Sequence, residues 1–200
     1  MNEQAVLPIV ELGGGRSPLE HLNLDAIEGE KVDLRQGIPL PDHSVAVLHS
    51  SDFYEHLTFE EGLALMRECK RVLASGGMVD FTIPDMAAAF AYHNKGPGTG
   101  WNGDLELCCY GDRSNEWQTH KAWYTPALLK HAWESEGWRV ETEFTQHGWP
   151  NQPKFRIKAW PLVERKRQFA LTIVSGTIIT KGHGRSNLDT ACWLPDGRIP

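Results

Sequence analysis

The sequence contains no long hydrophobic run, no basic leader and no excess of positive charge, and each absence excludes a class of protein. No apolar stretch approaches the roughly 20 residues that a membrane-spanning helix needs, so we expect no association with a membrane. The first residues carry no basic segment ahead of an apolar one, and a signal peptide is therefore not expected. The net charge of −6 disfavours a large nucleic-acid interface, which normally requires a basic face.

Cysteines are few, and their spacing excludes the common cysteine-based sites. The chain has Cys69, Cys108, Cys109 and Cys192, and none of them forms a CxxC pair. The sequence therefore predicts neither a disulfide framework nor a zinc site. Reduced thiols are typical of the cytoplasm, where we expect the protein. His43, His49 and His56 recur at a spacing of seven residues, but a strand and its flanking loops do not bring such positions to one face, so no metal ion is expected.

Enough apolar residues are present for one folded domain. The 200 residues are 40% hydrophobic, which is sufficient to bury a single core. We expect this domain to span residues 1–181, with a flexible tail at residues 182–200, where the sequence is polar and contains Gly and Pro. Seven of the eight tryptophans lie between Trp101 and Trp160, where they either belong to the core or line a substrate pocket. A basic cluster at residues 154–167 is interpreted as a solvated surface.

The most informative segment is a short apolar strand, residues 8–12, that runs into three consecutive glycines at residues 13–15. Glycine is needed where a backbone turns sharply and lets a ligand approach closely. A second short strand at residues 22–24 ends on Asp25, whose carboxylate can accept both hydroxyls of a ribose. The pattern predicts a site for an adenosine-type cofactor at the carboxyl edge of an α/β sheet. The link between the two strands is too short for a full crossover helix.

The next part of the chain alternates between strand and helix signals. Short strands are expected at residues 32–34, 44–50 and 78–83. Between the last two, Thr58 and Glu61 form a capping box that starts a helix, and we expect Gly76–Gly77 to end it. This alternation predicts a parallel, doubly wound sheet.

The second half is less regular. A helix is expected at residues 86–93, followed by a glycine-rich loop or lid at residues 94–104. Thr125 caps another helix, with an apolar stripe of Leu128, Leu129, Ala132 and Trp133, that ends at Gly137. A strand follows at residues 138–144, and residues 169–180 form either one strand or a hairpin.

Six pieces of sequence carry a resemblance to a known family. They are ELGGG (residues 11–15), NLD (23–25), VDL (32–34), IPLPDHSVAVLHSS (38–51), EHL (55–57) and ECKRVLASGGMVDFTIPDM (68–86). In this order and spacing they resemble class I S-adenosylmethionine (SAM) dependent methyltransferases, and most closely the small branch described as type 11-like. The resemblance is strong over residues 10–85 and continues weakly through residues 120–140.

The resemblance implies a fold and a cofactor. The expected fold is the Rossmann-like α/β fold of class I methyltransferases, with a mostly parallel seven-stranded sheet, an antiparallel edge hairpin and a shortened first crossover. The cofactor is SAM, and Gly13, Gly14 and Gly15 would pack under its amino-acid part. Asp25 would hold the ribose hydroxyls.

Further cofactor contacts come from the same resemblance. Asp33 and Leu34 would meet the edge of the adenine, through a carboxylate and a backbone N–H. Ser50 and Ser51 would form the floor of the site beside the methionine moiety. Glu11 lies at the start of the glycine turn, where family members often carry an acidic or polar residue.

The acceptor side is less defined by sequence. His56 is a candidate general base, because an unperturbed imidazole has a pKa of about 6.5; the alternative is a histidine that only bonds the backbone of a turn. The candidate pocket residues are Tyr54, Asp85, His120, Trp123 and Tyr124. The aromatic-rich second half predicts a small-molecule or sugar-like acceptor.

Three alternatives remain open at this point, and the oligomeric state is not predicted. The chain could be a non-catalytic SAM-binding module or a degenerate methyltransferase-fold partner of another protein. A nicotinamide-dependent oxidoreductase would need the full crossover helix that is absent after the glycines. A nucleic-acid methyltransferase is disfavoured by the net charge and supported only by the basic cluster at residues 154–167.

Overall fold

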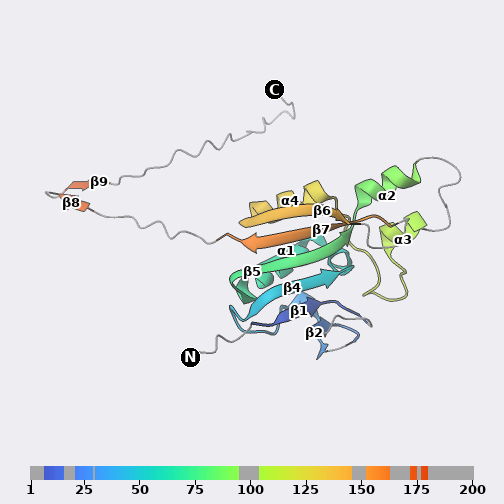
Figure 1. The fold of residues 1–200 in the computed structure, drawn as a ribbon, viewed down its shortest axis with the longest axis horizontal. Helices are drawn as coiled ribbons and strands as arrows, with labels where there is room; N and C mark the ends of the chain where they lie inside the picture. Colours follow the sequence, from blue (N-terminus) through green and yellow to red (C-terminus); the bar gives the residue numbers. More distant parts are fainter. Residues whose placement is uncertain are drawn as a thin grey trace, which may run out of the picture. The chain divides into compact units, whose positions relative to one another are not determined.

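The computed structural model describes residues 7–15, 21–28, 30–94, 104–145, 152–162, 172–174 and 177–179. Residues 1–163 form one compact unit and residues 164–200 another. The first unit is built on a seven-stranded sheet in the order β3-β2-β1-β4-β5-β7-β6 (Figure 1). The strands are β1 (Ile9–Leu12), β2 (Leu22–Asp25), β3 (Glu30–Lys31), β4 (Val45–Ser51), β5 (Leu73–Pro84), β6 (Trp138–Thr145) and β7 (Lys154–Pro161).

The sheet is parallel from β3 to β5 and antiparallel at the other edge, where β7 pairs with β5 and with β6. This arrangement confirms the expected mostly parallel sheet with an antiparallel edge. Because parallel strands end at the same edge, the segments that follow β1, β2 and β4 are brought together there.

The helices are α1 (Phe59–Val72), α2 (Met86–His93), α3 (Asp104–Tyr110) and α4 (Pro126–Ser135), with 3-10 turns η1 (Leu34–Gln36) and η2 (Tyr54–His56). The expected capping box of Thr58 and Glu61 starts α1, and Thr125 caps α4. Among the described residues, no helix combines the length and the apolar character needed to cross a membrane.

Helices α1 and α4 cover one face of the sheet (Figure 1). On this face Phe81 of β5 packs against Trp133 of α4, with ring centroids 5.9 Å apart, and Tyr54 packs against both. Trp133 and Trp138 are fully buried, so these two tryptophans belong to the core.

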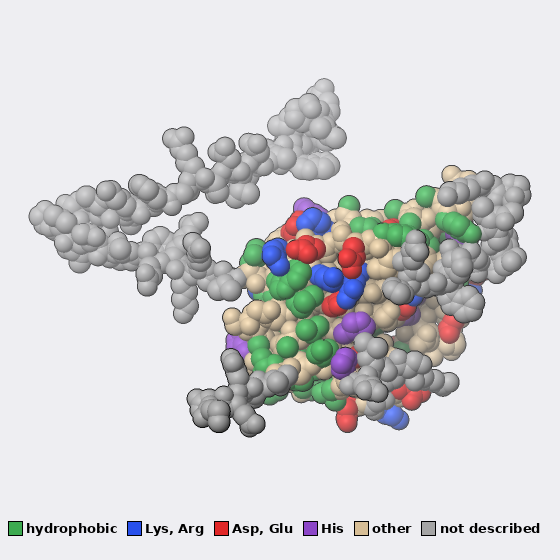
Figure 2. Space-filling view, in the orientation of Figure 1, with side chains coloured by type: hydrophobic (Ala, Val, Ile, Leu, Met, Phe, Trp, Pro, Cys, Tyr) green, Lys and Arg blue, Asp and Glu red, His purple; other side chains and the backbone are tan. Residues whose placement is uncertain are grey.

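The opposite face of β5, β6 and β7 carries ion pairs, and Figure 2 shows acidic and basic side chains gathered over these strands. Arg156 pairs with Asp80 and Glu143, and Lys158 lies 3.5 Å from Glu143. This part of the predicted basic cluster is therefore matched by carboxylates. Residues 165–167 of the cluster lie outside the described residues.

Two sequence expectations were wrong, one at the third strand and one at the end of α1. Residues 32–34 are not a strand, because the Asp33 side chain accepts the N–H of Arg35 and caps η1; the strand is Glu30–Lys31 instead. Helix α1 ends at Val72 rather than at Gly76–Gly77. Leu73 adopts an extended backbone, pairs with Val45 and is buried, so sheet pairing ends the helix before the glycines are reached.

Two further expectations fail in the second half. Strand β7 was not predicted, because its three basic residues were interpreted as a charged surface. Leu128 was assigned to the apolar stripe of α4, but it is exposed, while Leu129, Ala132 and Trp133 are buried.

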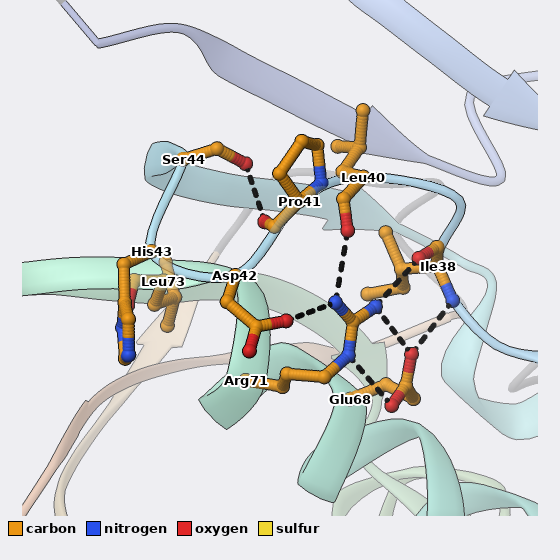
Figure 3. A network of polar contacts seen from close by, with 9 residues as sticks. All are labelled: Ile38, Leu40, Pro41, Asp42, His43, Ser44, Glu68, Arg71 and Leu73. Carbon is orange, nitrogen blue, oxygen red and sulfur yellow. Dashed lines mark hydrogen bonds and ion pairs between the residues drawn. The ribbon is translucent and has the colours of Figure 1, made fainter.

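Two of the six sequence pieces meet in space around Arg71 of α1 (Figure 3). We call the parts that meet the PLPD piece (residues 39–42) and the RVL piece (residues 71–73). The Arg71 guanidinium donates to the carbonyl oxygens of Ile38 (2.7 Å) and Leu40 (2.9 Å), and also to Glu68 and Asp42. Glu68 in turn accepts the backbone N–H of Ile38. These hydrogen bonds therefore attach the loop before β4 to α1. The two pieces have a structural role.

In the second unit, β8 (Thr172–Val174) and β9 (Thr177–Ile179) form an antiparallel pair. This confirms the hairpin alternative for residues 169–180. The boundary between the two units falls after Val163, whereas the sequence places a domain boundary after residue 181; the proposed tail at 182–200 lies outside the described residues.

Candidate functional site

The glycine turn lies at the carboxyl end of β1. Gly13 donates to the carbonyl oxygen of Leu24, and Gly14 donates to Asn23 Oδ1 at 3.0 Å. Gly13 has a φ of +67°, and a Cβ at this position would lie 2.4 Å from the ring of Phe53. Only glycine fits there, because both the backbone conformation and the space exclude a side chain.

Asp25, at the end of β2, faces this turn. Its carboxylate accepts the backbone N–H groups of Gly15 (3.0 Å), Ile27 (2.7 Å) and Glu28 (2.9 Å), and the residue is 9% exposed. A carboxylate has about four acceptor positions, so three amides leave room for one more donor. Asp25 thus organises the turn through its hydrogen bonds to three backbone N–H groups.

A cavity of about 400 Å³ opens at this point, lined by Gly15, Asp25, Ile27, Glu28, Asp112, Ser114, Asn115 and Gln118. We call it the turn cavity. It lies between the glycine turn and the segment at residues 111–120. From this segment the sequence indicated only His120 as a site residue.

Asp33 is engaged by Arg35 rather than directed toward open space. Its carboxylate accepts Nε (2.8 Å) and Nη2 (2.9 Å) of Arg35, and this hydrogen bonding lowers the pKa of Asp33. Arg35 then reaches the segment at residues 111–120, where it lies over the ring of Trp117 and 3.4 Å from Glu116. Leu34 is buried.

The remaining predicted cofactor residues lie on β1 and β4. Glu11 is buried, with Oε1 located 3.6 Å from Nδ1 of His49. Ser50 is buried and donates to the carbonyl oxygen of Leu12, which ties β4 to β1. Ser51 is exposed and donates to Asp52 at 3.3 Å.

A second cavity, of about 360 Å³, lies beyond the end of β4. Its lining consists of Asp52, Glu55, His56, Pro84, Leu107, Cys108, Gly111, Asp112, Gln118, His120, Gln152 and Lys154. We call it the histidine cavity. Asp112 and Gln118 line both cavities, so the two spaces adjoin.

Three side chains of this second cavity come together: Glu55, His56 and His120. Glu55 is 2% exposed, and neither of its carboxylate oxygens has a hydrogen-bond partner among the described residues. His120 Nε2 lies 3.9 Å from Glu55 Oε1, and the two imidazole centroids are 4.8 Å apart. Burial raises the pKa of Glu55 and lowers the pKa of both histidines.

The other acceptor-pocket candidates lie elsewhere. Tyr54 and Tyr124 belong to the core, with ring centroids 5.3 Å apart. Asp85 caps α2 through the N–H of Ala88. Trp123 is 48% exposed and packs against Phe90 and Tyr110.

Of the five candidates only His120 lines the histidine cavity. Glu55 was quoted in the sequence as part of a motif but was not identified as a site residue.

Strand order, the glycine turn and the acidic end of β2 together define an α/β protein built to bind a nucleoside cofactor at the carboxyl edge of its sheet. Residues 15–81 match the family model described as "Methyltransferase domain". No curated protein matches the chain in sequence.

Solved structures with this fold include SAM-dependent methyltransferases of low sequence identity. One from Archaeoglobus fulgidus is 16% identical and has a TM-score of 0.53, with 76% of this chain and 85% of that chain covered. One from Mesorhizobium loti is 20% identical with a TM-score of 0.51, and the coverage is 76% and 90%. The family match over residues 15–81 supports a methyltransferase, and the solved structures show that the chain has the fold of SAM-dependent methyltransferases.

Proposed function

We propose that the protein transfers the methyl group of SAM to a polar small molecule, such as a sugar-like compound, bound in the histidine cavity. The observation that carries this proposal is the contact between the two cavities: Asp112 and Gln118 line both. A methyl donor in the turn cavity and an acceptor in the histidine cavity would therefore be neighbours. Methyl transfer requires mainly such alignment and the exclusion of water.

The residues around the turn cavity suit the cofactor. A Cβ on Gly15 would meet no heavy atom of the described residues within 4 Å, so a ligand can approach the backbone there. Asp25 would hold the ribose, and the glycine turn would pack under the amino-acid part. Glu11, Asp33, Leu34, Ser50 and Ser51 remain predicted contacts. When bound, SAM supplies an electrophilic methyl group on a positively charged sulfur.

The lining of the histidine cavity favours a polar acceptor. It includes three carboxylates, two imidazoles and the ammonium group of Lys154, which pairs with Asp52. Asp52 has a φ of +54°, a conformation that an L-residue rarely adopts and that is often found at functional sites. Hydroxyl or amino groups of an acceptor would satisfy these groups, whereas an apolar molecule would leave them without partners.

His56 is a proposed proton acceptor for this reaction. Its Nδ1 lies 3.2 Å from the carbonyl oxygen of Thr119, and a carbonyl oxygen only accepts, so Nδ1 carries the proton. Nε2 of the neutral ring then presents a lone pair. Such a nitrogen can remove a proton from an acceptor hydroxyl or amine as the methyl group is transferred.

Calorimetric titration with SAM and with S-adenosylhomocysteine tests the cofactor assignment, and release of S-adenosylhomocysteine in the presence of hydroxylated and amino compounds tests turnover. We expect micromolar binding of both ligands. Folded protein that binds neither would contradict the proposed function. Binding without turnover on any acceptor would favour a non-catalytic SAM-binding module instead.

A further inference from the structure

We propose that Glu55, His56 and His120 form a binding site for one divalent transition-metal ion of the zinc type. The use of the ion, to bind an acceptor oxygen, rests on the proposed function, but the site itself does not. The three side chains offer one carboxylate and two imidazoles, which is a ligand set of catalytic zinc sites. The His43–His49–His56 spacing contributes only one of these residues: His43 bonds the carbonyl oxygen of Leu73, and His49 lies beside Glu11.

The separation of the ligand atoms is close to that of a metal site. One ligand atom from each of the three residues lies within 4.8 Å of the other two. With metal–ligand bonds of about 2.0–2.1 Å, ligand atoms of a tetrahedral site lie about 3.3 Å apart. The 3.9 Å separation of His120 Nε2 and Glu55 Oε1 already approaches this value. Small side-chain rotations would close the remaining distance.

Both histidines are held in the tautomer that a metal requires. Nδ1 of His56 faces the carbonyl oxygen of Thr119 at 3.2 Å, and Nδ1 of His120 faces that of Cys108 at 2.9 Å. Because carbonyl oxygens only accept, both Nδ1 atoms are protonated and both Nε2 atoms carry a lone pair. Metal-bound histidines almost always donate their other ring N–H in this way, which fixes the orientation of the ring.

The buried carboxyl group of Glu55 is a separate reason to expect a cation at this site. Its carboxylate is buried and lacks a hydrogen-bond partner among the described residues, and the nearby ammonium group of Lys154 is paired with Asp52. A buried carboxylate without a donor is costly, and a bound cation removes that cost. The site thus gathers two imidazoles and one carboxyl group, with one ligand atom of each within 4.8 Å of the other two. With an ion bound, Nε2 of His56 would hold the metal and would not act as the base of the reaction.

The backbone holds the three residues in a defined arrangement. Glu55 and His56 lie in η2, and the carbonyl oxygen of Glu55 accepts the N–H groups of Lys121 (2.8 Å) and Ala122 (3.2 Å). His120 is therefore tied to η2 although it lies far along the chain. The cavity on the open side leaves a fourth position for water or for an acceptor oxygen, as catalytic zinc sites do.

Metal titration of the full chain tests this site without any activity measurement. Protein treated with a chelator and then dialysed is titrated with Zn²⁺ and with Co²⁺, and Mg²⁺ serves as the control ion. We expect one Zn²⁺ per chain, visible-region Co²⁺ absorption typical of four or five ligands, and an increase in thermal stability with Zn²⁺ but not with Mg²⁺.

Glu55→Gln and His120→Ala should each weaken Zn²⁺ binding at least about 100-fold, because loss of a ligand exceeds the 10–100-fold effect of losing a group that only hydrogen-bonds to a ligand. His131→Ala, which removes an exposed histidine of α4, should bind like wild type. Circular dichroism establishes that each variant is folded. Wild-type protein without a bound ion, or Zn²⁺ binding that both ligand variants retain, would overturn the site.

The same preparations separate this inference from the proposed function. SAM binding by a chain that binds no Zn²⁺ would contradict the metal site alone, and would leave the Nε2 atom of His56 as a base. Zn²⁺ binding by a chain that binds no SAM would contradict the methyltransferase function alone.

Discussion

The guanidinium group of Arg35 lies 4.1 Å from the centroid of the Trp117 ring. Arg35 follows the predicted adenine-binding residues, and Trp117 belongs to the segment at residues 111–120 that lines both cavities. This contact therefore holds the segment against the cofactor side of the sheet. Asp33 orients the guanidinium through two hydrogen bonds.

Trp117→Ala should weaken SAM binding about fivefold, since a partly exposed cation–π contact contributes about 1 kcal/mol. The segment would close less firmly over the turn cavity, so the change should appear mainly as faster dissociation. Stopped-flow binding and calorimetry with SAM measure both quantities.

Trp160→Ala is the matched control for this prediction. Arg139 also lies 4.1 Å from the centroid of Trp160, but this pair belongs to β6 and β7 at the far edge of the sheet. Its loss should leave SAM binding unchanged. Equal effects of the two substitutions would contradict the role of the Arg35–Trp117 contact. Asp33→Ala should lower the SAM affinity more than Trp117→Ala, because it removes the predicted adenine contact as well as the acceptor that orients Arg35. An equal effect of the two substitutions would leave Asp33 only the role of orienting Arg35.

Asp25 provides a test of the cofactor site. Asp25→Asn should lower SAM affinity at least about tenfold, because hydrogen bonds to a charged carboxylate are roughly twice as strong as neutral ones. Asp25→Ala should also lower thermal stability, since three backbone N–H groups lose their acceptor. Glu141→Ala, on the exposed far edge of β6, is the control. Wild-type affinity in the Asn variant would leave Asp25 only a structural role in the turn.

The glycine turn offers a pair of substitutions that separates folding from binding. Gly13 and Gly15 both have positive φ, but a Cβ would meet Phe53 only at Gly13. Gly13→Ala should therefore reduce the free energy of unfolding by about 2–4 kcal/mol, from backbone strain together with overpacking. Gly15→Ala should cost about 1–2 kcal/mol from the strain alone and should abolish SAM binding. Urea unfolding and calorimetry measure the two effects.

Two results would contradict this account of the turn. Equal stability of the two glycine variants would exclude the contact between Gly13 and Phe53. SAM binding by Gly15→Ala at wild-type affinity would mean that the cofactor lies elsewhere.

Local sequence signals predicted most of the sheet. The glycine turn, the acidic end of β2, the Thr58 capping box and the Thr125 cap each depend on a few neighbouring residues, and all four are present. The signal for β7 was also local, because Lys154, Arg156 and Lys158 alternate with Phe155, Ile157 and Ala159. It was missed because the charges were considered without the apolar residues between them.

The candidate metal site could not be predicted in this way. Glu55 and His56 are far from His120 in sequence, and only the segment at residues 111–124 brings them together. Tyr54 and Tyr124 were assigned to the acceptor pocket but belong to the core. Aromatic residues suit both a pocket and a core, and no local pattern indicates which way a ring points. Asp33 stays a predicted adenine contact, and its neighbour Arg35 also donates to the carboxylate.

The network around Arg71 predicts a pH-dependent contribution to stability. Hydrogen bonding from Arg71 lowers the pKa of Glu68 below its ordinary value of 4.5. The stabilisation is therefore fully present above pH 4.5 and is lost as the pH falls through the lower pKa of the folded state. Glu68→Gln should reduce the free energy of unfolding by about 1–2 kcal/mol at pH 7, since it replaces charged hydrogen bonds with neutral ones.

Urea unfolding followed by tryptophan fluorescence between pH 7 and about pH 3.5 measures this effect, because Trp133 and Trp138 are buried reporters in the same unit. The difference between wild type and Glu68→Gln should shrink as the pH falls below 4.5 and through the lower pKa of Glu68 in the folded state, where the wild-type carboxylate becomes protonated as well. Glu136→Gln is the control: its bond to Arg67 has a length of 2.9 Å but lies on the surface, so it should lower the free energy of unfolding much less than Glu68→Gln does. A Glu68 effect that equals the Glu136 effect, or that does not change with pH, would show that the PLPD and RVL pieces are held together by packing rather than by this ion pair.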